Sequence, residues 1–96
     1  MLTIGQVVVT AIIDSMMNTN LSFYAFVFSA IQRHKRLDFG DLCSEDRKAN
    51  LDALKFDSRV LSIYFLPDGL KSDYKKIYII TEGDRSCTTV LFPHEY

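Results

Sequence analysis

The C-terminal part of the chain carries three runs of β-branched, aromatic and aliphatic residues, separated by turn-forming residues. Such runs favour extended strands, whereas the intervening Pro67-Asp68-Gly69 and Gly83-Asp84-Arg85 favour tight turns. Consecutive strands joined by short turns pair antiparallel, so the pattern predicts a β-meander, which needs a cover on one face. The predicted strands are 59–66, 76–82 and 86–92, and the unbroken apolar middle of the second indicates a central position.

A helix over about residues 21–36 is the predicted cover of this sheet. Asn20 or Ser22 can cap its start, and the basic run at its end is favourable against the helix dipole. Tyr24 and Phe28 lie off its main stripe, so they either widen the buried face or form an exposed aromatic patch. The main stripe, at helical spacing, consists of Phe23, Phe26, Val27, Ala30 and Ile31.

Further elements are predicted on either side of this helix. A β-branched run at 6–10 predicts a short strand, and Thr10 is the expected N-cap of a short helix over 11–17. Ser44 is the expected N-cap of another helix that begins at Glu45. The first strand is expected to join the same sheet, at an edge that the sequence leaves open.

These elements predict a single α+β domain over residues 1–96, with three helices (one short) covering a small antiparallel sheet of three to four strands. The hydrophobic fraction of 48% is ample for one core. The net charge of −1 argues against broad electrostatic binding of nucleic acid. Neither a secretory signal nor an apolar run long enough to cross a bilayer is present, so we expect a cytoplasmic protein without membrane contact.

Catalytic and metal-binding patterns are missing from the sequence. The soft metal ligands are Cys43, Cys87, His34 and His94, and none are paired at a zinc-site spacing. The two cysteines are expected to be reduced thiols, His34 to lie at a helix end beside other cations, and His94 to lie in an exposed tail. The glycines are isolated, so no phosphate-binding loop is indicated. We therefore expect a protein that is not an enzyme and has no metal or other cofactor.

Two groups of charged residues are candidate binding surfaces. Acidic residues gather before the third helix and at the last turn, and they could bind Mg²⁺, mimic nucleic-acid phosphate, or simply complement a helix start and a turn. The basic residues Arg33, Lys35 and Arg36 could contact phosphate or an acidic partner, or form a solvated helix end. The predicted partner-binding residues are Asp41, Glu45, Asp46, Glu82, Asp84 and Arg85.

Two stretches of the sequence together resemble the pattern of a known family. Phe39-Gly-Asp-Leu-Cys-Ser-Glu-Asp46 is followed by Asn50 and Ala53-Leu54, and Ile77-Tyr-Ile-Ile-Thr-Glu-Gly-Asp-Arg-Ser86 is followed by Thr88-Thr-Val-Leu-Phe-Pro-His-Glu-Tyr96. Both are similar to small, mostly uncharacterised proteins of plasmids, phages and integrative elements, labelled plasmid-related or tied to type I restriction. The chain departs from that pattern in having Phe39 in place of a tryptophan and a longer connection from Leu70 to Lys75.

The resemblance implies a mobile element that must survive host defence. Small proteins of such elements commonly act by binding a defence complex, so we expect a protein inhibitor of anti-CRISPR or antirestriction type, whose partner is a CRISPR or restriction nuclease complex. The alternative is a regulator or accessory factor that contacts nucleic acid through the basic residues. The sequence leaves open whether the chain is a monomer or a homodimer.

Overall fold

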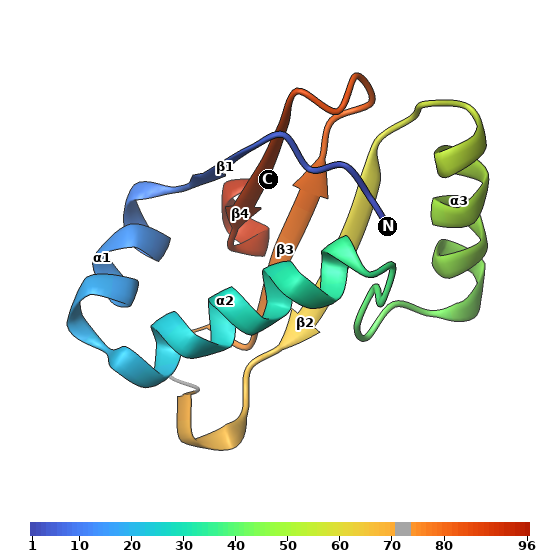
Figure 1. Ribbon diagram of the computed structural model, residues 1–96. Coiled ribbons are helices and arrows are strands. Elements are labelled where there is room, and N and C mark those ends of the chain that lie inside the picture. The colour runs from blue at the N-terminus through green and yellow to red at the C-terminus, as the bar shows by residue number, and fades with distance from the viewer. Residues whose placement is uncertain (71–73) are drawn as a thin grey trace.

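The computed structural model describes residues 1–70 and 74–96, and the middle of the connection from Leu70 to Lys75 lies outside these ranges. Helices come first along the chain and the meander comes last, as predicted (Figure 1). The elements are β1 (Gln6–Val9), α1 (Ala11–Thr19), α2 (Leu21–Lys35), α3 (Ser44–Lys55), β2 (Val60–Phe65), β3 (Lys76–Thr81) and β4 (Cys87–Leu91), with 3₁₀ turns at Asp68–Leu70 and Pro93–Glu95.

The four strands form one sheet in the order β1-β4-β3-β2. The meander β2-β3-β4 is antiparallel and β3 lies inside the sheet, which confirms both predictions. The expectation of a wholly antiparallel sheet is wrong, because β1 pairs parallel with β4, from Gln6 opposite Cys87 to Val9 opposite Val90. The rule of short turns does not govern this pair, since three helices and two strands separate β1 from β4 along the chain.

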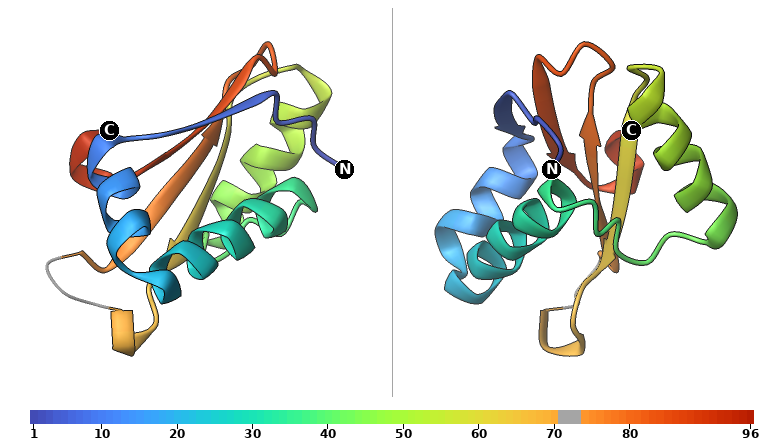
Figure 2. Two further views of the ribbon diagram at one scale, coloured as in Figure 1. Left: turned by 60° about the vertical axis from the view of Figure 1, so that its left-hand side comes forward. Right: turned by 45° about the vertical axis from the view of Figure 1, so that its right-hand side comes forward.

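The helix α2 crosses one face of the sheet, whereas α3 lies beside the β2 edge (Figures 1 and 2). Phe23, Val27 and Ala30 of α2 are buried against Tyr64, Ile77, Ile79 and Val90 of the strands. The residues of β2 that point toward α2 are the buried Val60, Ser62 and Tyr64. The opposite face takes Leu61, Ile63 and Phe65, and the Phe65 side chain is 55% exposed.

Local sequence signals explain the helix starts in part. Thr10 caps α1 by accepting the N–H of Ile13, and Asn20 caps α2 by accepting the N–H of Phe23 at 3.1 Å. The predicted N-cap of α3 is wrong. That helix already begins at Ser44, which leaves Cys43 at the cap position without a side-chain cap bond.

The edge of the sheet at β2 is closed by polar groups of neighbouring segments. The Asn50 side-chain amide of α3 donates to the Leu61 carbonyl and accepts the Leu61 N–H, as a neighbouring strand would. Ile63 N–H donates to the Phe39 carbonyl, and Asp41 N–H donates to the Ile63 carbonyl at 2.7 Å. A closed edge cannot add a strand from another chain.

A buried chain of hydrogen bonds joins α2 to the sheet. His34 is 0% exposed, with Nδ1 at 2.5 Å from Ser62 Oγ of β2 and Nε2 at 2.8 Å from Thr81 Oγ1 of β3. Thr81 Oγ1 lies 2.7 Å from Thr88 Oγ1 of β4, which donates to the carbonyl of Ile4 just before β1. His34 lies in the last turn of α2 beside Arg33 and Lys35, as predicted, but its ring is buried in the core. His34 continues the stripe of Phe23, Val27 and Ala30 one turn further.

Counting the hydrogens that each group can donate shows which group is the donor in each of these hydrogen bonds. The Ile4 carbonyl can only accept, so the one hydrogen of Thr88 points to it, and Thr88 must accept from Thr81. The hydrogen of Thr81 is then used, so His34 donates from Nε2 and accepts at Nδ1 from Ser62. Every polar group in this series of hydrogen bonds has a partner when the His34 imidazole is neutral.

Acid should therefore weaken the fold through His34. Burial lowers the pKa of His34 from 6.5 to about 4, so between these values the unfolded chain binds a proton that the folded chain does not. Stability from this source is complete above pH 6.5 and is lost as pH falls toward 4, by about 2 kcal/mol from pH 7 to pH 5. Urea unfolding across that range measures it.

The control compares the two histidines of the chain. His34→Gln should flatten the dependence of unfolding free energy on pH, even if that variant is less stable at every pH. His94→Gln should keep the wild-type slope, since the His94 side chain is exposed. Equal slopes for His34→Gln and the wild type would contradict the assignment.

Candidate functional site

The solvent side of α2 carries a second apolar stripe. Leu21, Tyr24 and Phe28 are 83%, 47% and 56% exposed, and we call these three residues the α2 stripe. The partly buried Ile31 continues the same line toward the core. Spacings of three, four and three residues place all four side chains along one side of a helix, as in the seam of a coiled coil.

This stripe is separate from the one that packs on the sheet. The buried side of α2 is formed by Phe23, Val27, Ala30 and His34, so the helix is apolar on two sides. A helix on the surface of a domain needs only one such side, and an exposed apolar cluster marks an interaction site. Of the two alternatives for Tyr24 and Phe28, the structure shows the exposed aromatic patch.

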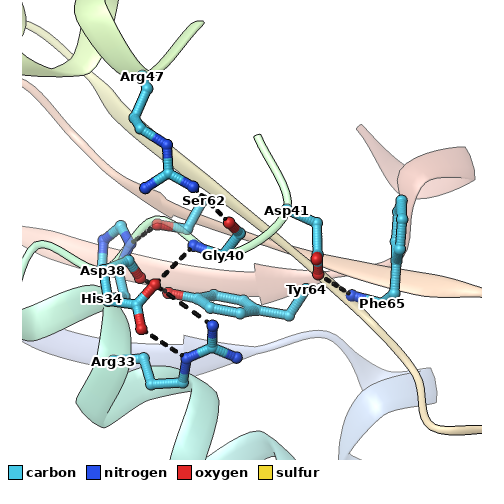
Figure 3. Close-up of polar contacts among 9 residues, drawn as sticks. All are labelled: Arg33, His34, Asp38, Gly40, Asp41, Arg47, Ser62, Tyr64 and Phe65. Atoms are coloured by element: carbon cyan, nitrogen blue, oxygen red, sulfur yellow. Dashed lines mark hydrogen bonds and ion pairs between the residues drawn. The ribbon is translucent and has the colours of Figure 1, made fainter. Parts of the chain in front are cut away.

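The loop between α2 and α3 is held against β2 by polar contacts (Figure 3). Gly40 has a positive φ of 74°, its N–H donates to Asp38 Oδ1 at 3.1 Å, and its carbonyl accepts from Arg47 at 2.7 Å. The Asp41 carboxylate accepts the N–H of Phe65 at 2.9 Å, beyond the residues that Asn50 covers. Asp41 was predicted to bind a partner, and the structure gives its carboxylate a role in closing the β2 edge.

The other predicted residues near the last turn are also engaged within the chain. The Asp84 carboxylate accepts the N–H of Ser86 at 2.9 Å. Arg85 donates to the carbonyls of Ser58, Glu82 and Ala53, which ties the turn to the end of α3. The Glu82 carboxylate lies 3.4 Å from the Arg59 guanidinium, in a pair whose side chains are both partly exposed.

The predicted acidic surface is divided in space. Glu45 and Asp46 are exposed in the first turn of α3, whereas Arg85 contacts the Ala53 carbonyl near its last turn. The rise of an α-helix separates these two ends by roughly 12 Å. The six predicted residues therefore lie toward both ends of α3 and do not form one tight cluster.

The predicted basic patch is divided as well. The Arg33 guanidinium binds both carboxylate oxygens of Asp38, at 2.9 and 3.3 Å, and lies over the Tyr64 ring. The hydrogen bond from Arg33 lowers the pKa of Asp38. The Arg33 side chain remains 44% exposed in this ion pair, Arg36 is exposed and Lys35 is half-buried.

Potential metal ligands among the described residues do not converge. In the ranges that the structure describes, no three His, Cys, Asp or Glu side chains gather closely enough to hold a metal ion. Cys43 is an exposed free thiol and Cys87 is a half-buried one, and the exposed His94 ring stacks on Tyr74 with 5.5 Å between centroids.

The two stretches that carry the family resemblance contribute largely to the fold. Thr81 and Thr88 belong to the buried chain, and Asn50 closes the β2 edge. Glu95 accepts from the Thr10 hydroxyl and from the Phe92 N–H, which holds the C-terminal turn to the end of β1. The α2 stripe lies outside both stretches.

Sequence reasoning missed two features of this region. The burial of His34 was signalled by its place four residues after Ala30, on the period of the core stripe. Leu21 was signalled as a member of the α2 stripe by its spacing from Tyr24 and Phe28.

No family model matches the chain, and neither a curated protein nor a solved structure matches it significantly. The resemblance drawn from the sequence therefore stays a prediction. Within the described ranges, no helix is both long and apolar enough to cross a membrane.

The close approach of the loop to β2 predicts that Gly40→Ala is strongly destabilising. A Cβ at Gly40 would lie 2.1 Å from the Ile63 carbonyl oxygen, and its positive φ is strained for any L side chain. We expect a loss of about 2–4 kcal/mol in unfolding free energy, measured by urea denaturation. Gly69→Ala is the matched control, since no atom of the described residues lies within 4 Å of its Cβ position. Equal stabilities of the two variants would contradict this account.

Proposed function

We propose that this protein is a non-enzymatic inhibitor that binds a host defence complex of CRISPR or restriction type through the α2 stripe. The observation that carries the proposal is the exposure of Leu21, Tyr24 and Phe28 along one side of a helix whose other side holds the core. The class of partner rests on the resemblance to proteins of mobile elements.

The composition around the stripe supports a protein partner. Residues 15–32 contain no charged side chain, so the second half of α1 and most of α2 are neutral. The centres of protein interfaces are depleted of charge and enriched in aromatic residues, and Tyr is a frequent hot spot there. Tyr24 and Phe28 supply large apolar rings, and Tyr24 adds a hydroxyl that can be bonded by the partner.

The shape of the stripe supports docking as a helix. Anchors three and four residues apart fit a hydrophobic groove, or the seam between two helices. The helix is held rigidly, since Phe23 and Val27 are fully buried and His34 is bonded at both ring nitrogens. A helix that is already ordered loses little conformational entropy on binding.

Engaged polar groups support inhibition without catalysis. The His34 ring is buried and satisfied by two hydroxyl groups, and Asp41 and Asp84 each accept a backbone N–H. Side chains committed in this way are poor general bases or nucleophiles, whereas a binding surface requires none.

The experiment compares two exposed apolar pairs of the same chain. The Tyr24→Ser, Phe28→Ser variant should bind purified CRISPR effector or type I restriction complexes at least tenfold more weakly and lose inhibition of DNA cleavage. Leu51→Ser, Phe56→Ser, in α3 and at its C-cap, is the control, because these side chains are comparably exposed, at 50% and 76%, but lie outside the α2 stripe. Binding is measured by biolayer interferometry, and circular dichroism confirms folding.

Three outcomes would contradict the proposal. The wild-type protein could bind none of the complexes, both double variants could bind equally well, or the protein could bind bare duplex DNA with an affinity that falls steeply with salt. The last result would favour the alternative of a nucleic-acid-contacting factor, with Lys35 and Arg36 as the phosphate contacts.

A further inference from the structure

The two edges of the sheet differ in how their backbone groups are hydrogen-bonded by the rest of the chain. At β2, the outward backbone groups of Leu61 and Ile63 are paired with Asn50 and the loop before α3. At β1, the N–H groups of Gln6 and Thr10 donate inward to the carbonyls of Ser86 and Val90.

In a parallel pair of strands, the backbone N–H and C=O groups of every second residue point toward the partner strand. The N–H and C=O groups of Val7 and Val9, which lie between the residues bonded to β4, therefore point outward from β1. None of the hydrogen bonds found for residues 1–70 and 74–96 reaches these groups. Figure 2 shows β1 at the margin of the sheet, with α1 continuing from its end and α2 lying across the sheet face.

Apart from the shortness of β1, this edge lacks the usual protection against strand addition. Exposed edges are commonly blocked by lysine, proline, a bulge or an inward-pointing charge. The sequence from Met1 to Ile13 contains neither a charged residue nor a proline. The side chains of Val7 and Val8, on opposite faces of β1, are 41% and 42% exposed.

We propose that β1 pairs antiparallel with β1 of a second copy of this chain, which joins two sheets into one. The segment is self-complementary, because a two-fold axis at Val8 places Val7 of each copy opposite Val9 of the other. Each of these opposite pairs exchanges two backbone hydrogen bonds, and Val8 faces its own counterpart as a non-hydrogen-bonded pair. No like charges meet, since the first thirteen residues are uncharged.

The expected dimer is weak. A four-residue strand offers a seam well below the roughly 1,200 Å² of a standard stable interface, so the contact belongs to the transient class. We expect a dissociation constant in the range of tens to hundreds of micromolar. The seam is distinct from the α2 stripe, so the dimer does not depend on the function proposed above.

Sedimentation equilibrium between about 10 μM and 1 mM protein tests self-association directly. The wild-type protein should shift from monomer to dimer, and Val8→Lys should weaken the dimer at least tenfold, because two like charges would meet on the axis. The α2 stripe variant Tyr24→Ser, Phe28→Ser should dimerise as the wild type does. A wild-type protein that stays monomeric at 1 mM would overturn the proposal.

Disulfide trapping tests the register, in a background of Cys43→Ser and Cys87→Ser. Val8→Cys should form a covalent dimer under mild oxidation, since the Cα atoms of such an opposite pair lie about 4.5 Å apart. Val7→Cys is the matched control, because its counterpart lies diagonally at about 7–8 Å, too far for ready bridging. Equal trapping of both variants, or preferential trapping of Val7→Cys, would overturn the proposed pairing.

Discussion

The hydrogen-bonded chain through His34 is the contact on which the rest of the arrangement depends. It includes one hydroxyl group from each of β2, β3 and β4 and ends at the Ile4 carbonyl just before β1. The fully buried imidazole of His34 connects these groups to α2. Three hydroxyl side chains can lie on the covered face of the sheet only because each has a partner. The same bonds set the position and rotation of α2 over the sheet.

The rotation of α2 has a consequence for the surface of the molecule. With Phe23, Val27 and His34 directed at the strands, Tyr24 and Phe28 are left on the solvent side. The α2 stripe is therefore the part of a strongly apolar helix that the domain does not use for its own stability. Its exposure is the observation on which the proposed binding function rests.

The two edges of the sheet differ in whether their outward backbone N–H and C=O groups have hydrogen-bond partners among the described residues. Asn50 and Asp41, both within the first of the two stretches on which the predicted resemblance rests, close the β2 edge. The charged residues that looked most like a binding surface in the sequence are in part fold-forming. The outward backbone groups of the uncharged strand β1 have no partner among the residues that the structure describes. Composition pointed to the charged groups because a sequence does not show which carboxylates are already bonded.

The sequence by itself determined the order of the elements, the capping of α1, the meander and the inner place of β3. These features depend on periodicity, turn residues and contacts between near neighbours along the chain. Tertiary structure alone decided that β1 lies parallel to β4, that Ser62 and Thr81 are the partners of His34, and that Asp41 serves the β2 edge. Each of those depends on groups far apart in the sequence, and hydrogen-bond partners at such distances leave no local pattern to recognise.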